Sequence, residues 1–209
     1  TRSDRDWSSD VCSSDLKNKN ITAEVCVHHL WFDDRDYEKM GTRIKWNPSI
    51  KTIKDKEALW EALLADKIDV IATDHAPHTI QEKNNTYFKA PSGGPLVQHS
   101  LVAMLEMSRK GFITPEKVVQ KMCHAPADLF RIKDRGYIRE GYFADLVLID
   151  PKKSWVVSPE NILYKCGWSP FDGLEFSHKV DTTFVNGKIV FANDQIKSGF
   201  TGERVTFNM

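Results

Sequence analysis

Strand-like and helix-like segments alternate in the first part of this chain, and this order constrains its fold more than any other feature. Residues 21–27, 42–46 and 68–73 have the β-branched and apolar content of short strands. Residues 53–66, between the last two, place apolar side chains at helical spacing. Strands that are separated by a helix pair in parallel through right-handed crossovers. The sequence therefore predicts an α/β fold built on a parallel sheet.

Polar residues follow each of these predicted strands. The first strand ends at His28 and His29, the second at Asn47 and the third at Asp74. Parallel α/β folds place their chemistry at the carboxyl ends of the strands. Strand alternation would send the side chains of His28 and His29 to opposite sides, so at most one is expected to bind a metal. Asp74 could bind a metal or carry a proton, and a turn-forming Asp is an equally good interpretation.

Two further motifs lie downstream of Asp74. His75 and His78 are three residues apart, a spacing that can present one imidazole to a substrate. The loop APSGGP contains Gly93 and Gly94, whose backbone N–H groups can approach a ligand closely. A plain surface turn explains the same loop equally well. Each motif taken alone leaves its role open.

The second half of the chain changes from helices to strands. The predicted helices there span residues 95–111, 114–122 and 125–130. The first of them is expected to bury an apolar stripe of Leu96, Val97, Leu101, Met104 and Leu105. The predicted strands span residues 144–150, 154–158 and 182–191. Asn186-Gly187 is typical of a hairpin turn in the last of these, so a separate β layer is expected.

Composition excludes several classes of function. The chain has 209 residues and equal numbers of basic and acidic side chains, 29 of each, which argues against a nucleic-acid partner. An apolar run of the roughly 20 residues that span a bilayer is absent, and a cytoplasmic protein is expected. The four cysteines lack CxxC spacing and are predicted to be reduced packing residues. Residues 1–16 repeat SSD and are interpreted as a non-native or disordered leader.

Seven segments, taken in order, resemble the C-terminal half of dihydroorotases of the cyclic amidohydrolase group, in the amidohydrolase superfamily. They are EVCVHHL, KWNPSIK, ALWEALLADKIDVIATDHAPHTIQEK, APSGGP, GYFADLVLIDP, SPFDG and TTFVNGKIVF. The resemblance implies that residues 17–135 are the C-terminal part of a (β/α)8 TIM barrel, containing strands six to eight and the following helices. It implies that residues 136–209 are part of a small composite β-sandwich domain.

The same resemblance implies a role for individual residues. His29 would bind a metal, and Asp74 would be both a metal ligand and the catalytic proton carrier. The residues implied to hold the substrate are Asn47, His78, Gly93 and Gly94. Relatives usually have a Pro-Gly arrangement leading into GLE, whereas this chain continues from Pro95 into Leu-Val-Gln. Among the implied roles, this departure bears most on that of Gly93 and Gly94 in holding the substrate.

The implied activity is the zinc-dependent interconversion of N-carbamoyl-L-aspartate and dihydroorotate, a step of pyrimidine biosynthesis, by a protein that could be a homo-oligomer. The binuclear zinc site of such enzymes also needs an HxH pair, which this sequence lacks. The chain alone is therefore expected to be an inactive fragment without stoichiometric zinc and with open sheet edges. Two alternatives remain open. One is an allantoinase or hydantoinase, and the other is a dihydroorotase-like structural partner without catalysis.

Overall fold

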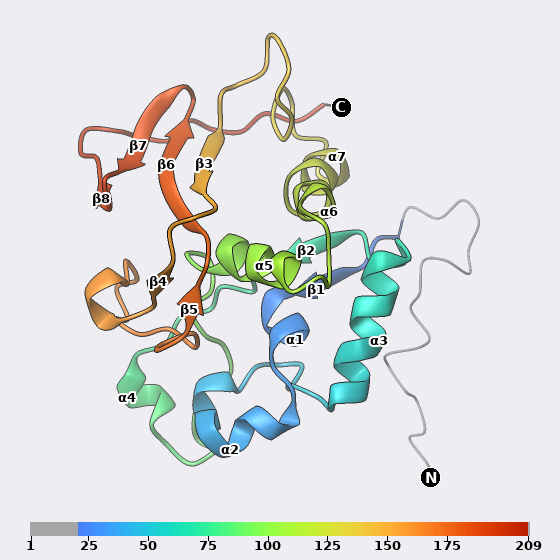
Figure 1. Ribbon diagram of the computed structural model, residues 1–209, viewed down its shortest axis with the longest axis vertical. Coiled ribbons are helices and arrows are strands. Elements are labelled where there is room, and N and C mark those ends of the chain that lie inside the picture. Colours follow the sequence, from blue (N-terminus) through green and yellow to red (C-terminus); the bar gives the residue numbers. More distant parts are fainter. Residues whose placement is uncertain (1–20, 209) are drawn as a thin grey trace.

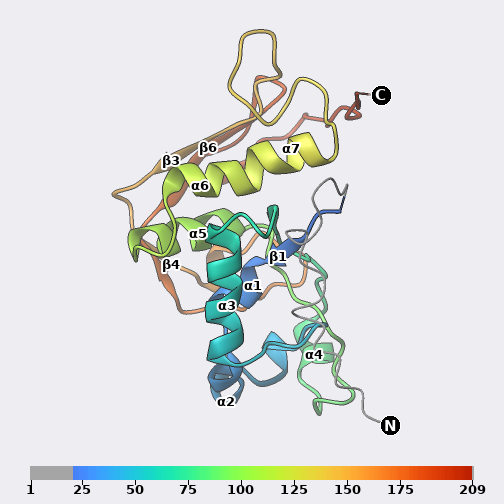
Figure 2. The same cartoon turned by 90° about the vertical axis from the view of Figure 1, so that its right-hand side faces the viewer.

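The computed structural model describes residues 21–208, and the predicted leader at residues 1–16 lies outside this range. The fold is a mixed α/β arrangement (Figure 1). The four-stranded antiparallel sheet and helices α6 and α7 lie at one end of the molecule, and α2 and α4 lie at the other (Figures 1 and 2). The short helices between these ends include α1 (Val27–Trp31), α2 (Tyr37–Met40) and α4 (Ile80–Lys83).

A parallel strand pair lies near the middle of the molecule (Figure 1). It consists of β1 (Glu24–Cys26) and β2 (Val70–Ala72), and Cys26 is the partner of Ala72 in the register. Helix α3 (Ile53–Leu64) lies between the two strands in the sequence. The predicted parallel pairing of the first and third strands is therefore confirmed, although a closed barrel is not formed by residues 21–208.

The predicted second strand, residues 42–46, is wrong. A 3-10 helix (Gly41–Ile44) occupies most of this segment, and Lys45 is extended at its end. The Lys45 carbonyl accepts hydrogen bonds from the Gly93 amide (2.9 Å) and from the Lys83 ammonium (3.1 Å). The backbone therefore pairs with a loop and with a side chain, so it does not join a strand ladder.

The first strand is also shorter than predicted, because it ends at Cys26 and helix α1 begins at Val27. The Phe32 amide donates to the His28 carbonyl at 3.0 Å, which closes a helical turn over the histidine pair. The alternation of strand side chains therefore does not apply to His28 and His29.

Helix α3 agrees with its predicted position. Thr52 caps it, and the Thr52 hydroxyl and the Asp55 carboxylate form a capping box. Trp60 and Leu63 are buried, and the indole N–H of Trp60 donates to the Leu30 carbonyl at 3.0 Å. This face of the helix fixes α3 against α1.

Helix α5 (Ser100–Arg109) begins five residues later than predicted. The amides of Leu96 and Val97 donate to Nδ1 of His75, at 3.0 and 3.3 Å, and this anchors the segment before the helix in a loop conformation. Val97, predicted to be part of the apolar stripe, is 56% exposed. The helix ends before Gly111, whose φ is +84°.

Helices α6 (Pro115–Val119) and α7 (Ala125–Leu129) are joined by a π-helical turn, Gln120–His124. The three segments form one continuous helical rod (Figure 2). The Thr114 hydroxyl accepts the Lys117 amide at 3.2 Å, as the predicted N-cap requires. The helices predicted at 114–122 and 125–130 are therefore present as parts of a single rod.

The antiparallel sheet has the strand order β3-β6-β7-β8. Its strands are β3 (Leu146–Asp150), β6 (Lys179–Val185), β7 (Lys188–Ala192) and β8 (Gln195–Ile196). Asn186 and Gly187 have φ values of +50° and +74°, so the predicted hairpin turn is confirmed. A separate antiparallel pair is formed by β4 (Trp155–Val156) and β5 (Glu175–Phe176).

The apolar core joins residues from both halves of the chain. Phe171 and Phe176 are completely buried, and Phe171 stacks on Phe32 with 5.7 Å between the ring centroids. Leu30 and Ile44 belong to the same cluster. The predicted division of the chain at residue 135 stays a prediction. Among residues 21–208, every helix is too short or too polar to cross a membrane.

Candidate active site

The candidate site lies at the carboxyl ends of β1 and β2. Because Cys26 and Ala72 are register partners, the residues that follow them emerge at the same edge of the strand pair. His29 is half-buried in α1, and Asp74 is exposed with a φ of +44°. Asp tolerates this left-handed conformation better than most residues. The strand pair thus presents an imidazole and a carboxylate at one edge.

His29 is held by the segment that contains Asn47. Nε2 of His29 lies 3.1 Å from the Pro48 carbonyl oxygen, and Asn47 is the exposed residue before Pro48. Burial lowers the pKa of His29, while the Pro48 carbonyl and the charge of Asp74 oppose this shift. The carboxylate of Asp74 therefore acts electrostatically on His29.

The glycine loop lies against the segment that follows Asp74. His75 and Gly94 form a parallel β-bridge, and the Ala76 amide donates to the Gly94 carbonyl at 3.3 Å. Gly93 has a φ of +117°, and a Cβ atom there would lie 2.6 Å from the Ala76 carbonyl oxygen. A side chain would therefore force the loop away from this segment.

His78 is anchored to the same loop. Its Nε2 lies 3.1 Å from the Ser92 carbonyl oxygen, so this nitrogen carries the proton and donates. The indole N–H of Trp168 donates to the His78 carbonyl at 2.7 Å. The side chain is about one-third exposed, and its Nδ1 lies 4.0 Å from Glu82. The His78 ring is thus positioned by the loop at one nitrogen.

Lys83 connects the glycine loop to the Asn47 segment. Its side chain is completely buried, and its ammonium donates to the carbonyls of Lys45, Pro91 and Gly93 at 3.1, 2.9 and 2.8 Å. The Thr42 hydroxyl donates to the Lys83 carbonyl. Three acceptors match the three donors of an ammonium group. Lys83 therefore ties together the two loops predicted to hold a substrate.

Three potential metal-binding side chains meet beside Asp74. The Cys26 sulfur and one imidazole nitrogen from each of His28 and His29 lie within 4.8 Å of one another. Burial, together with the charges of Asp74 and Glu24, raises the pKa of the Cys26 thiol to about 12. Asp74 does not belong to this close group, although its charge affects both Cys26 and His29. The donor set of one thiol and two imidazoles suits zinc.

His28 has a distinct environment within this group. The side chain is buried, and its ring stacks on Trp46 with centroids 4.3 Å apart and planes 7° apart. Nδ1 is buried without a hydrogen-bond partner among the described residues. Burial lowers the pKa of His28 to about 2, with a smaller contribution from His29. His28 is thus a neutral imidazole with an uncommitted nitrogen.

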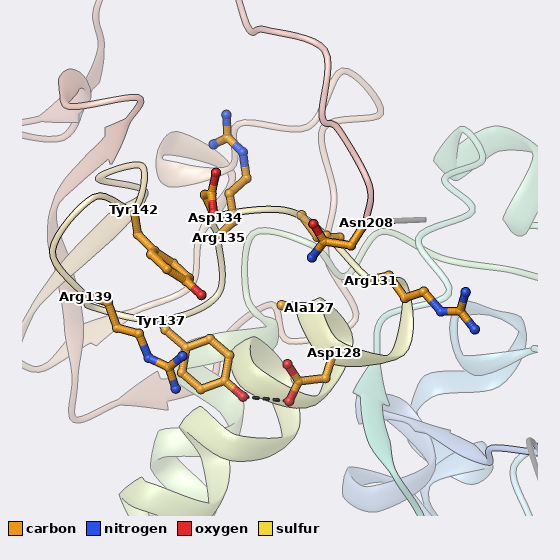
Figure 3. A pocket seen from close by; sticks show the side chains of 10 residues that line it. Ala127, Asp128, Arg131, Asp134, Arg135, Tyr137, Arg139, Tyr142 and Asn208 are labelled. Carbon is orange, nitrogen blue, oxygen red and sulfur yellow. Dashed lines mark hydrogen bonds between the residues drawn. The ribbon is translucent and has the colours of Figure 1, made fainter.

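A cavity of about 360 Å³ lies elsewhere, between α7 and the chain before β3 (Figure 3). None of the predicted site residues lines it. Some of its polar side chains pair with each other or with nearby residues. The Tyr137 hydroxyl donates to Asp128 at 2.6 Å, and Arg139 lies over the Tyr137 ring at 4.2 Å. Figure 3 shows the Arg131 side chain pointing away from Tyr137 and Arg139.

Comparisons with known proteins define the class of this chain. Residues 12–190 match the amidohydrolase family, and the chain belongs to that family. It is 36% identical over 185 residues to a dihydroorotase from Pyrococcus horikoshii, which covers 88% of this chain and 42% of the relative. It is 39% identical over 173 residues to a dihydroorotase from Clostridium acetobutylicum, which covers 82% of this chain and 41% of the relative.

Among solved structures, the chain is similar to the L-hydantoinase (dihydropyrimidinase) from Arthrobacter aurescens. The two align with a TM-score of 0.81 and 28% sequence identity, over 88% of this chain and 42% of the hydantoinase. The chain thus spans about two-fifths of the length of the relatives that it matches. The resemblance that the sequence motifs indicated is confirmed at the level of the family.

Sequence reasoning placed the six predicted residues near one edge of the sheet but missed several neighbours. It treated Cys26 as a packing residue and left Lys83 and Trp46 without a role. The position of Cys26 at a strand end, three residues before His29, was a usable signal. A buried lysine inside a polar segment has no comparable signal, because its acceptors are backbone carbonyls from distant positions.

Proposed function

We propose that the protein to which this chain belongs is a dihydroorotase-type cyclic amide hydrolase that interconverts dihydroorotate and N-carbamoyl-L-aspartate. Identity of 36% and 39% to curated dihydroorotases supports this substrate. In this proposal, residues 17–135 are the last strands and helices of a (β/α)8 barrel, and residues 136–209 are part of a composite β-sandwich.

The observation that carries the proposal is that His29 and Asp74 follow two paired parallel strands, near enough for the charge of Asp74 to oppose the lowering of the His29 pKa. A carboxylate and an imidazole in this position can serve a metal and a reacting water together. We assign His29 and Asp74 as metal ligands in the complete protein. Asp74 is also the catalytic proton carrier.

When bound, zinc polarises the amide carbonyl and lowers the pKa of water at the site. Asp74 accepts the proton that the water loses as its oxygen bonds to the carbonyl carbon. Asp74 then gives this proton to the ring nitrogen as the carbon–nitrogen bond breaks. In the biosynthetic direction the same transfers run in reverse, and water is released.

The remaining residues hold the substrate in this proposal. His78 keeps Nδ1 available because Nε2 is committed to the Ser92 carbonyl. Asn47 offers an exposed amide beside the His29 contact. Gly93 and Gly94 would bring their backbone N–H groups close to the ring of the substrate. Such positioning lowers the entropic cost of reaching the transition state.

The test is hydrolysis of dihydroorotate by the complete protein and by its Asp74→Asn variant. We expect the variant to lose about a thousandfold in rate, because the amide cannot carry the proton. Asp34→Asn is the matched control, since Asp34 is exposed and lies in a 3-10 helix, Asp34–Asp36, away from the strand ends. Full activity of D74N would overturn the role of Asp74.

A hydantoinase is the second candidate, because the L-hydantoinase alignment covers 88% of this chain with a TM-score of 0.81. A panel of dihydroorotate, hydantoin and allantoin, tested on the complete protein, separates these candidates. Preferred turnover of hydantoin or allantoin would replace the proposed substrate. Absence of turnover on the whole panel would favour the non-catalytic alternative.

A further inference from the structure

We propose that Cys26, His28 and His29 form a binding site for one thiophilic divalent cation within this chain, with the Cys26 sulfur as a ligand. The proposal rests on the metal site of the proposed function, because it shares His29. It adds Cys26 and His28 as ligands. It also replaces the sequence-based expectation that the chain alone holds no stoichiometric zinc.

The first support is the proximity of the donors. Sulfur and imidazole nitrogen atoms of the three residues lie within 4.8 Å of one another, although the residues belong to a strand and to a helix. Ligands of a tetrahedral zinc ion lie at about 2.0–2.3 Å from the metal, so small side-chain rotations would bring these donors to bonding distance.

The second support is the buried nitrogen of His28. The residue is 1% exposed, and its Nδ1 has no hydrogen-bond partner among the described residues. An unpaired buried polar atom destabilises a fold, so a native structure usually gives such an atom a partner. The stack on Trp46 keeps the ring in place. A bound cation would give the buried nitrogen of His28 a partner.

The donor chemistry selects the class of cation. One thiolate and two imidazoles favour zinc, cobalt or cadmium over magnesium and calcium, which prefer oxygen ligands. On binding, the sulfur–hydrogen bond of Cys26 breaks, a sulfur–metal bond forms, and the proton leaves to solvent. No electron is transferred. The carboxylate of Asp74 lies near enough to influence the site and would favour a cation there.

Cobalt(II) titration of the purified chain provides the test, because a cobalt–thiolate bond gives a near-ultraviolet charge-transfer band. We expect saturation at about one equivalent. In Cys26→Ser the band should disappear, whereas Cys166→Ser should retain it. Cys166 is the matched control because it is also a half-buried free thiol. A band that persists in C26S, or no saturable band in the wild-type chain, would overturn the proposal.

A second measurement uses no substitution and therefore does not depend on the folding of a variant. Cadmium should slow alkylation of Cys26 in the wild-type chain, while alkylation of Cys166 and Cys123 should be unchanged, as followed by mass spectrometry. Equal rates for Cys26 with and without cadmium would contradict the proposal. Because neither measurement requires turnover, failure of dihydroorotate hydrolysis and failure of this metal site are distinguishable.

Discussion

The ammonium of Lys83 lies 2.8 Å from the carbonyl oxygen of Gly93, in a position fully shielded from solvent. Lys45 and Pro91 supply the other two carbonyl acceptors. These hydrogen bonds link residues 45, 91 and 93 through a single side chain. The geometry of the proposed substrate loops therefore depends on a residue that contacts neither metal nor substrate in our proposal.

Substitution of Lys83 by Met should destabilise the chain by about 3 kcal/mol, because the aliphatic stem is kept while three buried carbonyls lose their donor. Urea unfolding of the wild-type and variant chains measures this difference. Lys89→Met is the matched control, since Lys89 is exposed in the same segment. Equal losses for K83M and K89M would show that the buried hydrogen bonds contribute little.

The Lys83 contribution should depend on pH. Burial and the nearby charge of Lys45 lower the pKa of Lys83 to about 8, below its ordinary value of 10.5. Between pH 8 and pH 10.5 the Lys83 amine holds its proton more strongly in the unfolded chain than in the folded chain. The free energy of unfolding therefore rises with pH in this range. The stability advantage of wild type over K83M should therefore grow from about pH 8 to about pH 10. A constant difference across this range would contradict the lowered pKa.

Gly93→Ala should destabilise the glycine loop by roughly 1–3 kcal/mol. The new Cβ would lie 2.6 Å from the Ala76 carbonyl oxygen, at a φ of +117° that side chains rarely adopt. Thermal unfolding measures the loss. In Gly202→Ala, the control, the added Cβ has no heavy atom within 4 Å and φ is not in the left-handed range. A similar unfolding temperature for both variants would indicate that the loop relaxes freely.

Glu106→Gln should reduce stability at neutral pH by about 1–3 kcal/mol. The buried Glu106 carboxylate accepts hydrogen bonds from Arg109 (2.6 Å) and from the Ser177 hydroxyl (2.6 Å). Burial alone would raise its pKa, but Arg109 and Ser177 lower it to about 2. The folded-state pKa lies below the ordinary 4.5, so this contribution is present above pH 4.5 and is lost as pH falls towards 2.

Unfolding measured from neutral pH down to about pH 3 checks this prediction, because the wild-type chain should lose its advantage over E106Q across that interval. Glu57→Gln is the control, since Glu57 is exposed on α3. An advantage of wild type over E106Q that stays constant down to pH 3 would show that Glu106 is not the titrating group.

Local signals in the sequence predicted part of the fold well. Thr52 and Thr114 mark the starts of α3 and α6, and Asn186-Gly187 marks the hairpin, because capping and turn formation depend on neighbouring residues. Residues 42–46 misled the prediction, since their β-branched content resembles a strand. The partners of Lys45 come from positions 83 and 93, which periodicity does not reveal.

The candidate site was predictable in outline for a different reason. Asp74 and His29 follow parallel strands, and the ends of such strands meet at one edge. Their chemical roles came from the family resemblance and stay predictions. The helical turn at Val27–Trp31 was not predicted, and this turn brings both His28 and His29 within reach of Cys26. A pair of adjacent histidines can thus converge where strand alternation would separate them.

The burial of Phe171 and Phe176 bears on how this protein can be divided. Trp31 contacts both rings edge-on, with centroids 5.2 and 5.9 Å apart. A chain cut at residue 135 would expose Trp31 and the stacked face of Phe32 to water. Such a truncated product would expose a large apolar surface, prone to aggregation, beside α1, the helix that contains the histidine pair. Expression boundaries for site-directed work therefore belong beyond β5, although the six predicted site residues end at Gly94.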